Sequence, residues 1–351
     1  MLNKLFLKIF GLFDLIKDWL LHWGLRILLV FFALIILHNV LKMSELTIKY
    51  TGDYKKMVPV YEEENKFMNS YVVGEGSKTL VILSAFGSQS PIIQYKTLLE
   101  GLKDDYKVVI IEYFGYGYSM SIKKPRTNEN IASEIKKTLE LREIYGPYVL
   151  IAHETSNMYA MKFQEMYPDL VQGIVSIDGL YPSEIEDDYR AKQISNKVSN
   201  VNITSIFELT GFERIASYVS LKTFYIDKMQ EMPDVYTKED IAVYRNRIGS
   251  QYLSRTMVRE INKLQDNMNE MKEYKYPTYL PVLELLSSES VKLYSYDKDS
   301  GASKVNLYEL ANNVITNPEI QRMSLIEGDY MLQLTNPTTT INTIKNFLAS
   351  F

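Results

Sequence analysis

Residues 147–169 read PYVLIAHETSNMYAMKFQEMYPD, and this segment carries the most informative pattern in the sequence. Its first part, PYVLIAH, is apolar and β-branched, as is typical of a buried strand. The part that follows Thr155 has helical character and stops before Pro168. Small residues, Ala152 and Ser156, stand two positions either side of Glu154. The pattern therefore predicts a tight turn from strand to helix that presents the Glu154 carboxylate.

Strands and helices alternate on both sides of this turn. Strand patterns occur at TLVILSAFG (79–87), KVVIIEYFGYG (107–117) and VQGIVSIDG (171–179), and helical patterns at 92–105 and 128–146. Such alternation predicts a parallel sheet covered by helices on both faces, with ligands gathered at the carboxyl ends of the strands. Those ends are Phe86, Tyr113, Glu154 and Asp178.

Residues 182–276 follow a different pattern, because they are charged and helical without a convincing buried strand. They predict a helical lid inserted into the α/β core. Strand character returns in TYLPVLELLSS (278–288), and TTTINTIKNFLASF (338–351) predicts a final helix. We therefore expect the two parts of the core at residues 44–181 and 277–351.

The first 43 residues predict a membrane anchor. ILLVFFALIILHNVL (27–41) carries no formal charge, and its apolar stretch is about long enough for a bilayer core of roughly 30 Å. We expect a transmembrane helix at 24–43, preceded at 1–23 by an amphipathic segment in the interface. A buried core helix and a cleaved signal peptide are the alternatives, but no A-x-A-like cleavage site follows. We expect a single pass through the cell membrane, with the soluble domain outside the cytoplasm.

The composition excludes several classes of function. With 39 basic and 43 acidic residues and no long basic block, the chain offers nucleic acid no attractive surface. The absence of cysteine excludes disulfides, thiolate metal sites and cysteine nucleophiles. Histidine, the usual general base near neutral pH, occurs only at His22, His38 and His153. We expect no metal and no cofactor.

The ordered motifs resemble the α/β-hydrolase fold over roughly residues 71–351. LSAFGSQSP (83–91) is similar to the family's oxyanion loop, EYFGYGYS (112–119) to its D-x-x-G-x-G-x-S turn, and EGDYMLQLTNP (327–337) to its G-H-Y ending. The helical insertion occupies the usual lid position. Residues 146–179 look especially like membrane-anchored hydrolases of Gram-positive bacteria. The resemblance implies a mostly parallel sheet flanked by helices, a helical lid and an N-terminal transmembrane helix.

The same resemblance implies a degenerate catalytic triad. The family's nucleophile elbow, G-x-S-x-G, is replaced by Ala-His-Glu-Thr-Ser, so Glu154 stands at the nucleophile position. Asp329 stands where the family has its catalytic histidine. The acid position falls near Glu289 or Ser290, with Asp178 as another candidate.

Neighbouring residues take supporting roles in this interpretation. The backbone N–H groups of Phe86 and Thr155 stand at the positions of the oxyanion-hole donors. His153 precedes the nucleophile position, where a family histidine packs beneath the turn even when it transfers no proton. Ser156 is conceivable as a displaced nucleophile, but it more simply replaces a glycine for close packing.

Three functions follow from these positions. If Glu154 and Asp329 approach each other, as serine and histidine do in active relatives, they would share a proton or hold a cation. The leading hypothesis is nevertheless a pseudo-hydrolase that binds a small molecule or partner in the former active-site cleft. An active hydrolase of small esters or amides, with an unconventional Glu154/Asp329 site, is the second. A structural subunit of a membrane complex is the third. The expected partners are the membrane and a small-molecule ligand.

Overall fold

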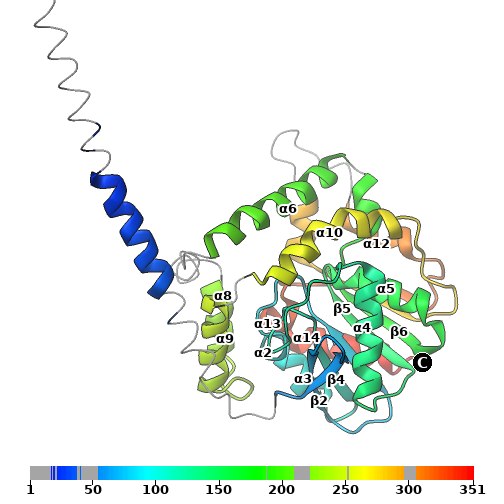
Figure 1. Cartoon of the computed structure of the whole chain (residues 1–351). Helices are drawn as coiled ribbons and strands as arrows, with labels where there is room; N and C mark the ends of the chain where they lie inside the picture. The colour runs from blue at the N-terminus through cyan, green and yellow to red at the C-terminus, as the bar shows by residue number, and fades with distance from the viewer. Residues whose placement is uncertain are drawn as a thin grey trace, which may run out of the picture.

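A computed structural model describes residues 17, 19, 22–37, 40, 54–186, 188–208, 222–250, 253–295 and 306–351. Residues 22–37 form a helix that lies apart from the rest of the fold (Figure 1). Its apolar side chains are exposed, among them Ile27 and Phe32. Within these residues, no helix combines the length and apolarity needed to cross a membrane. The predicted segments 1–23 and 24–43 fall partly outside the described residues.

Eight strands form one sheet in the order β1-β2-β4-β3-β5-β6-β7-β8. The strands are β1 (Met57–Tyr61), β2 (Lys66–Val73), β3 (Thr79–Leu83), β4 (Lys107–Glu112), β5 (Tyr148–His153), β6 (Val171–Ile177), β7 (Val282–Ser287) and β8 (Gln321–Ile326). β2 pairs antiparallel with β1 and β4, and the pairs from β4 to β8 are all parallel. The predicted mostly parallel sheet is confirmed.

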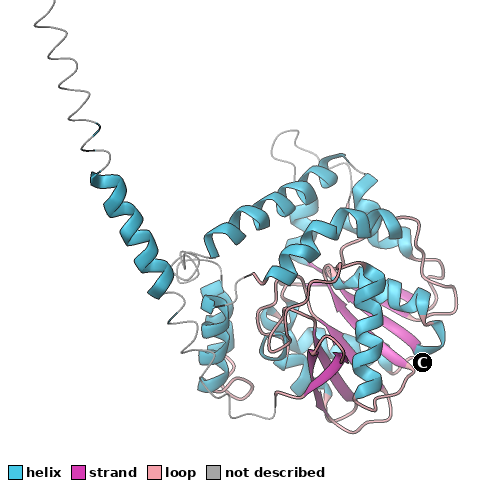
Figure 2. Cartoon of the chain, viewed as in Figure 1, coloured by secondary structure: helices cyan, strands magenta, loops and turns pink. Residues whose placement is uncertain are grey.

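Helices cover both faces of the sheet (Figure 2). In β3, Leu80 and Ile82 belong to one core cluster, whereas Val81 and Leu83 belong to another, because successive strand residues point to opposite faces. The first cluster is closed by α3 (Lys96–Leu102) and α14 (Pro337–Leu348), the second by α4 (Asn128–Leu141) and α5 (Ser156–Met166). Burial on both faces explains why these strands are apolar throughout.

The described residues between β6 and β7 are helical. They form η2 (Pro182–Glu186), α6 (Asp188–Glu208), α8 (Lys222–Gln230), α9 (Lys238–Ser250) and α10 (Arg255–Met271). Ser254 caps the N-terminus of α10, because its hydroxyl accepts from the backbone N–H of Met257. Its buried face, with Met257, Ile261, Leu264 and Met268, joins the core cluster under α5. These helices lie in the segment where the sequence predicts a lid, and we refer to them as the lid helices, or the lid. Short helices complete the core: α2 (Pro91–Gln94), η1 (Pro168–Leu170), α11 (Ser288–Ser295), α12 (Leu307–Val314) and α13 (Leu332–Thr335).

The antiparallel strands β1 and β2 are absent from the sequence-based prediction. β1 is short and contains Pro59, and β2 carries polar residues at positions that the parallel strands fill with apolar ones. Asn69 of β2 is buried because its side-chain oxygen accepts from Lys56 N at 2.7 Å and its amide donates to Glu112 at 3.0 Å. These polar contacts stabilise the strand without leaving the hydrophobic signature that predicts one.

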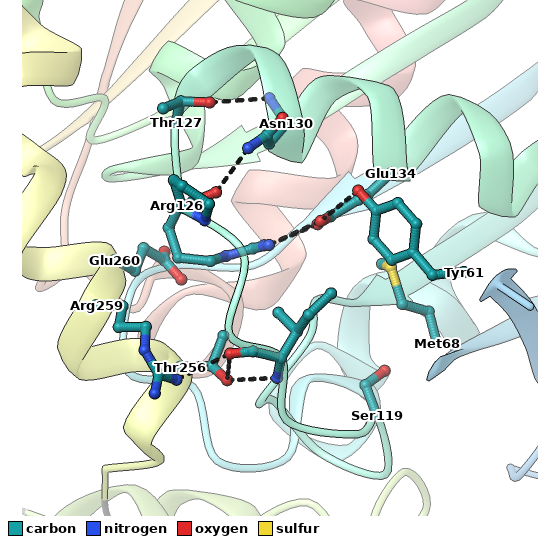
Figure 3. Close-up of polar contacts among 12 residues, drawn as sticks. Tyr61, Met68, Ser119, Arg126, Thr127, Asn130, Glu134, Thr256, Arg259 and Glu260 are labelled. Atoms are coloured by element: carbon teal, nitrogen blue, oxygen red, sulfur yellow. Dashed lines mark hydrogen bonds and ion pairs between the residues drawn. The ribbon is translucent and has the colours of Figure 1, made fainter. Parts of the chain in front are cut away.

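A buried charge cluster connects the lid to the core. Arg126 Nη1 contacts the two Glu134 carboxylate oxygens at 2.9 and 2.8 Å, and the Tyr61 hydroxyl donates to Glu134 at 3.1 Å. Glu260 of α10 lies on the other side of Arg126 (Figure 3). Burial alone would lower the pKa of Arg126, but Glu134 and Glu260 outweigh it and raise that pKa. The guanidinium therefore lies between the Glu134 carboxylate of the core and the Glu260 carboxylate of α10.

The turn after β4 is built around Glu112. One carboxylate oxygen of this fully buried residue accepts from Tyr118 N at 2.7 Å and from the Asn69 amide at 3.0 Å. Burial raises the pKa of Glu112 to about 7. Gly117 has φ +47°, and a Cβ there would lie 2.0 Å from the Glu112 carboxylate. The glycine at 117 is therefore a packing requirement.

Replacing Gly117 with alanine should destabilise the fold. Gly117→Ala combines backbone strain with a clash against Glu112, and we expect it to lower the free energy of unfolding by about 3 kcal/mol in urea titrations. Gly87→Ala is the matched control, because Gly87 also has positive φ but nothing within 4 Å of the added Cβ. That control should cost about 1 kcal/mol. Equal losses would contradict the role of the Glu112 contact.

The raised pKa of Glu112 also predicts a pH dependence. Between its ordinary pKa of about 4.5 and 7, the folded protein keeps the carboxyl neutral while the unfolded chain ionises it. The stability contribution is thus full below pH 4.5 and is lost as the pH rises through 7. Glu112→Gln imitates the neutral form. We expect the melting temperature of this variant, relative to that of the wild type, to rise from pH 5 to pH 8. A difference in melting temperature that stays constant with pH would disprove this.

Candidate functional site

The turn between β5 and α5 holds Glu154 in a left-handed conformation, with φ +53°. Such a conformation costs a non-glycine residue about 1 kcal/mol or more and persists only where surrounding contacts enforce it. Here Glu154 N donates to Ile177 O, and Leu180 N donates to Glu154 O, each at 3.0 Å. Ala152 and Ser156 are fully buried against the turn. The tight turn that the sequence predicts is present.

The Glu154 carboxylate occupies two backbone N–H donors. Its Oε2 accepts from Phe86 N at 3.3 Å and from Thr155 N at 3.0 Å, and the Thr155 hydroxyl donates to it at 2.5 Å. These are the two N–H groups that the sequence places at the oxyanion hole. Such donors stabilise an acyl-transfer intermediate only when they face its developing charge. In this structure they face the protein's own carboxylate.

A lysine of the lid neutralises Glu154. Its Oε1 forms an ion pair with Nζ of Lys197 on α6. The Lys197 side chain is 39% exposed and the Glu154 side chain 24%. Burial would raise the pKa of Glu154, but Lys197 and the Thr155 donors outweigh it and lower that pKa to about 2. Glu154 is therefore a carboxylate at neutral pH. Sequence reasoning missed Lys197, because no motif marks it within the helical insertion.

Asp329 has partners of its own. Its Oδ2 accepts from the Tyr225 hydroxyl at 3.3 Å and its Oδ1 from Met331 N at 2.8 Å. Burial raises its pKa. Among the described contacts, no hydrogen bond joins Asp329 to Glu154. Other donors satisfy each carboxylate of the predicted pair, and the approach of the two side chains stays a prediction.

His153 lies beneath the turn and is fully buried. Its Nε2 lies 2.7 Å from Tyr330 O, and its Nδ1 lies 2.6 Å from the Tyr95 hydroxyl. Because a carbonyl can only accept, Nε2 carries the proton and Nδ1 accepts from Tyr95. Burial lowers the pKa of His153, which favours the neutral ring. Both ring nitrogens are thus engaged in structural hydrogen bonds.

The candidates for the acid position differ in burial and in their hydrogen-bond partners. Asp178, at the carboxyl end of β6, is buried; it accepts from Ser287 N at 2.7 Å and from the Ser290 hydroxyl at 2.9 Å. Glu289 is 58% exposed and pairs with Lys292 at 2.7 Å. Asp178 and Ser290 therefore lie together at the carboxyl edge of the sheet, whereas Glu289 faces solvent.

Ser156 does not face a substrate. Its hydroxyl is fully buried, donates to Ser84 O and lies 2.9 Å from the Tyr113 hydroxyl. These contacts join the start of α5 to the ends of β3 and β4. Ser156 thus packs the turn, and its oxygen is not presented to a ligand.

A cavity of about 480 Å³ is lined by Phe86 and Lys197, which both contact Glu154. Its described walls come from the loop after β3, from α2, from the lid helices and from the residues after Asp329. They comprise Ala85, Phe86, Gly87, Ser88, Gln89, Gln94, Gln193, Asn196, Lys197, Asn200, Val201, Tyr225, Tyr244, Leu253, Tyr330 and Met331. Within the described part of the chain, no cluster of three or more His, Cys, Asp or Glu could hold a metal ion. The lid tyrosines and amides carry no sequence motif and were not predicted.

The sequence matches no family model. It is 24% identical to the protein YbdG of Bacillus subtilis strain 168 over 228 residues, which cover 64% of this chain and 67% of that protein. A karrikin insensitive 2 receptor of Petunia hybrida is 28% identical over 113 residues, or 31% of this chain and 41% of the receptor.

Solved structures resemble the fold more extensively. A laboratory-evolved variant of a potato epoxide hydrolase aligns with a TM-score of 0.63 at 15% identity, covering 84% of this chain and 99% of that one. Other similar structures include further epoxide hydrolases, an esterase and an α/β hydrolase, at 14 to 16% identity. This chain has an α/β-hydrolase fold.

Proposed function

We propose that this protein is a noncatalytic, membrane-anchored member of the α/β-hydrolase fold that binds a small molecule in the cavity above Glu154. The observation that carries the proposal is the Glu154 carboxylate, which takes up both backbone N–H donors at the oxyanion position. A substrate oxyanion would have to compete with a charge that is already there. The relative named as a receptor is consistent with binding as the retained role.

At the triad positions, the protein lacks two further groups that serine-hydrolase chemistry requires, a nucleophile with a removable proton and a histidine base. That chemistry requires a nucleophile whose proton a histidine removes, and that histidine must be oriented by an acid. Asp329 stands at the histidine position and accepts from Tyr225 and Met331. His153 uses both ring nitrogens below the turn. The protein therefore has a cavity and lid helices, but the described residues include no histidine available as the general base.

A hydrolase that uses Glu154 directly is the second candidate. Its support is the ionised carboxylate, whose Oε2 is held by two N–H groups while Oε1 remains for attack once Lys197 moves away. Attack on the acyl carbon would give a mixed anhydride and release the alcohol or amine, and an activated water would then have to hydrolyse the anhydride. Asp329 is the residue available for that step. A purely structural role in a membrane complex is favoured less, because the protein keeps a 480 Å³ cavity.

The proposed anchor rests on the exposed apolar surface of residues 22–37. Water-exposed side chains such as Leu25, Ile27, Leu29 and Phe32 are costly in bulk solvent and favourable in a bilayer. Trp19 and Trp23 precede them, as residues of a membrane interface often do. We infer a single pass through the cell membrane, with the domain outside the cytoplasm.

Restoring the triad should restore reactivity. Glu154→Ser frees both N–H donors, and Asp329→His supplies a base near Asp178. We expect the double variant to hydrolyse p-nitrophenyl acetate and to react with a fluorophosphonate roughly 10²-fold faster than Glu154→Ser alone. The wild type should do neither. Ester turnover by the wild type that is lost in Glu154→Ala and Asp329→Ala would instead establish the second candidate.

The anchor can be tested by fractionation. The full chain should sediment with membranes and resist alkaline carbonate extraction, whereas residues 44–351 alone should stay in the soluble fraction. Protease added to intact cells should digest the domain if it lies outside the cytoplasm. Recovery of the full chain in the soluble fraction would disprove the anchor; protection from the protease would reverse only the orientation.

A further inference from the structure

One wall of the cavity is a single polar face of α6. Gln193, Asn196, Lys197, Asn200 and Val201 line it, and their spacing places them on one side of the helix. The three carboxamides are solvent-exposed and form no hydrogen bond with any described residue. Each carboxamide can both donate and accept. This face therefore offers mixed hydrogen-bonding capacity to whatever enters the cavity.

The tyrosines of the cavity add flat apolar faces. Tyr225 and Tyr244 come from the lid and Tyr330 follows Asp329. The Tyr244 ring is buried, and no described residue hydrogen-bonds to its hydroxyl. A ligand in the cavity can therefore donate to this hydroxyl or accept from it.

The charge of the cavity is balanced. Lys197 is the only charged side chain among the described residues that line it, and Glu154 neutralises it. A charged ligand would lose hydration without gaining an opposite charge. An apolar ligand would strand the amides and the Tyr244 hydroxyl. Both ligand classes are therefore disfavoured, although most ligand pockets are predominantly apolar.

We propose that the cavity binds a neutral ligand rich in hydroxyl and amide groups, of the kind found in acetamido sugars. Carboxamides on the α6 wall meet its hydroxyl and amide groups, and tyrosine rings contact its C–H faces. This inference rests on the proposed binding function and specifies the ligand class of the same cavity. It assigns specificity to Asn196 and Tyr244, which lie outside the altered triad.

The test measures binding of three probes to the full chain by isothermal titration calorimetry and saturation-transfer NMR. The probes are chitobiose, a uronic-acid disaccharide and octyl acetate. We expect chitobiose to bind best, and Asn196→Leu and Tyr244→Phe each to weaken it about fivefold to tenfold, the effect of one lost hydrogen bond. Asn202→Leu is the matched control on α6, because Asn202 pairs with Asn262 and does not line the cavity.

The outcomes separate the two proposals. Absence of chitobiose binding, preference for the acidic or the apolar probe, or chitobiose affinity unchanged in both cavity variants would overturn the ligand class. Hydrolysis of octyl acetate would instead overturn the noncatalytic function. Melting temperatures show whether each variant is folded; Tyr244→Phe removes only a hydroxyl that has no described partner, so this variant should keep the wild-type melting temperature.

Discussion

The left-handed turn at Glu154 is the constraint on which the candidate site depends. It joins β5 to α5 so tightly that its backbone bonds directly to residues after β6, through Ile177 O and Leu180 N. Ser156 extends the connection to Ser84 and Tyr113 at the ends of β3 and β4. The ends of four strands are thereby held around one apex. Whatever side chain occupies that apex faces the N–H groups of Phe86 and Thr155.

A carboxylate at this apex changes the electrostatics of the site. A serine would leave the two N–H donors unoccupied and the cavity floor neutral. Glu154 fills those donors and adds a negative charge that is largely removed from water, and such a charge requires compensation. Lys197 provides it from the lid. The position of α6 is therefore coupled to the residue at the nucleophile position, which would not hold for a serine at the apex.

The sequence predicts the parts of this structure that depend on local patterns. The strands β3 to β7 and the helices between them were recognisable because both faces of each strand are buried and their residues are correspondingly apolar. The turn at Glu154 was recognisable because it needs small neighbours. Contacts between distant segments were not predictable. Lys197, Tyr225 and Tyr244 reach the cavity from lid helices whose polar faces read as solvent-exposed surface.

The expectation that Glu154 and Asp329 approach each other rests on the geometry of active relatives. It assumed that two carboxylates would adopt the positions of a serine and a histidine, which attract each other through a hydrogen bond. A carboxylate oxygen accepts hydrogen bonds, and in this structure Glu154 accepts from Thr155 and Lys197 while Asp329 accepts from Tyr225 and Met331. The hydrogen-bonding capacity of the side chains then decided their partners.

Lys197 links the cavity to the Glu154 turn. It contacts Glu154 on one side and lines the ligand space on the other, so a ligand that hydrogen-bonds to its ammonium group competes with the ion pair. A ligand that leaves the pair intact keeps α6 in place and meets the carboxamide face as it stands. A ligand that breaks it must also solvate or neutralise Glu154. Because the two cases differ in charge balance, the proposed binding function implies that the ion pair favours neutral ligands over charged ones and couples occupancy of the cavity to the position of α6.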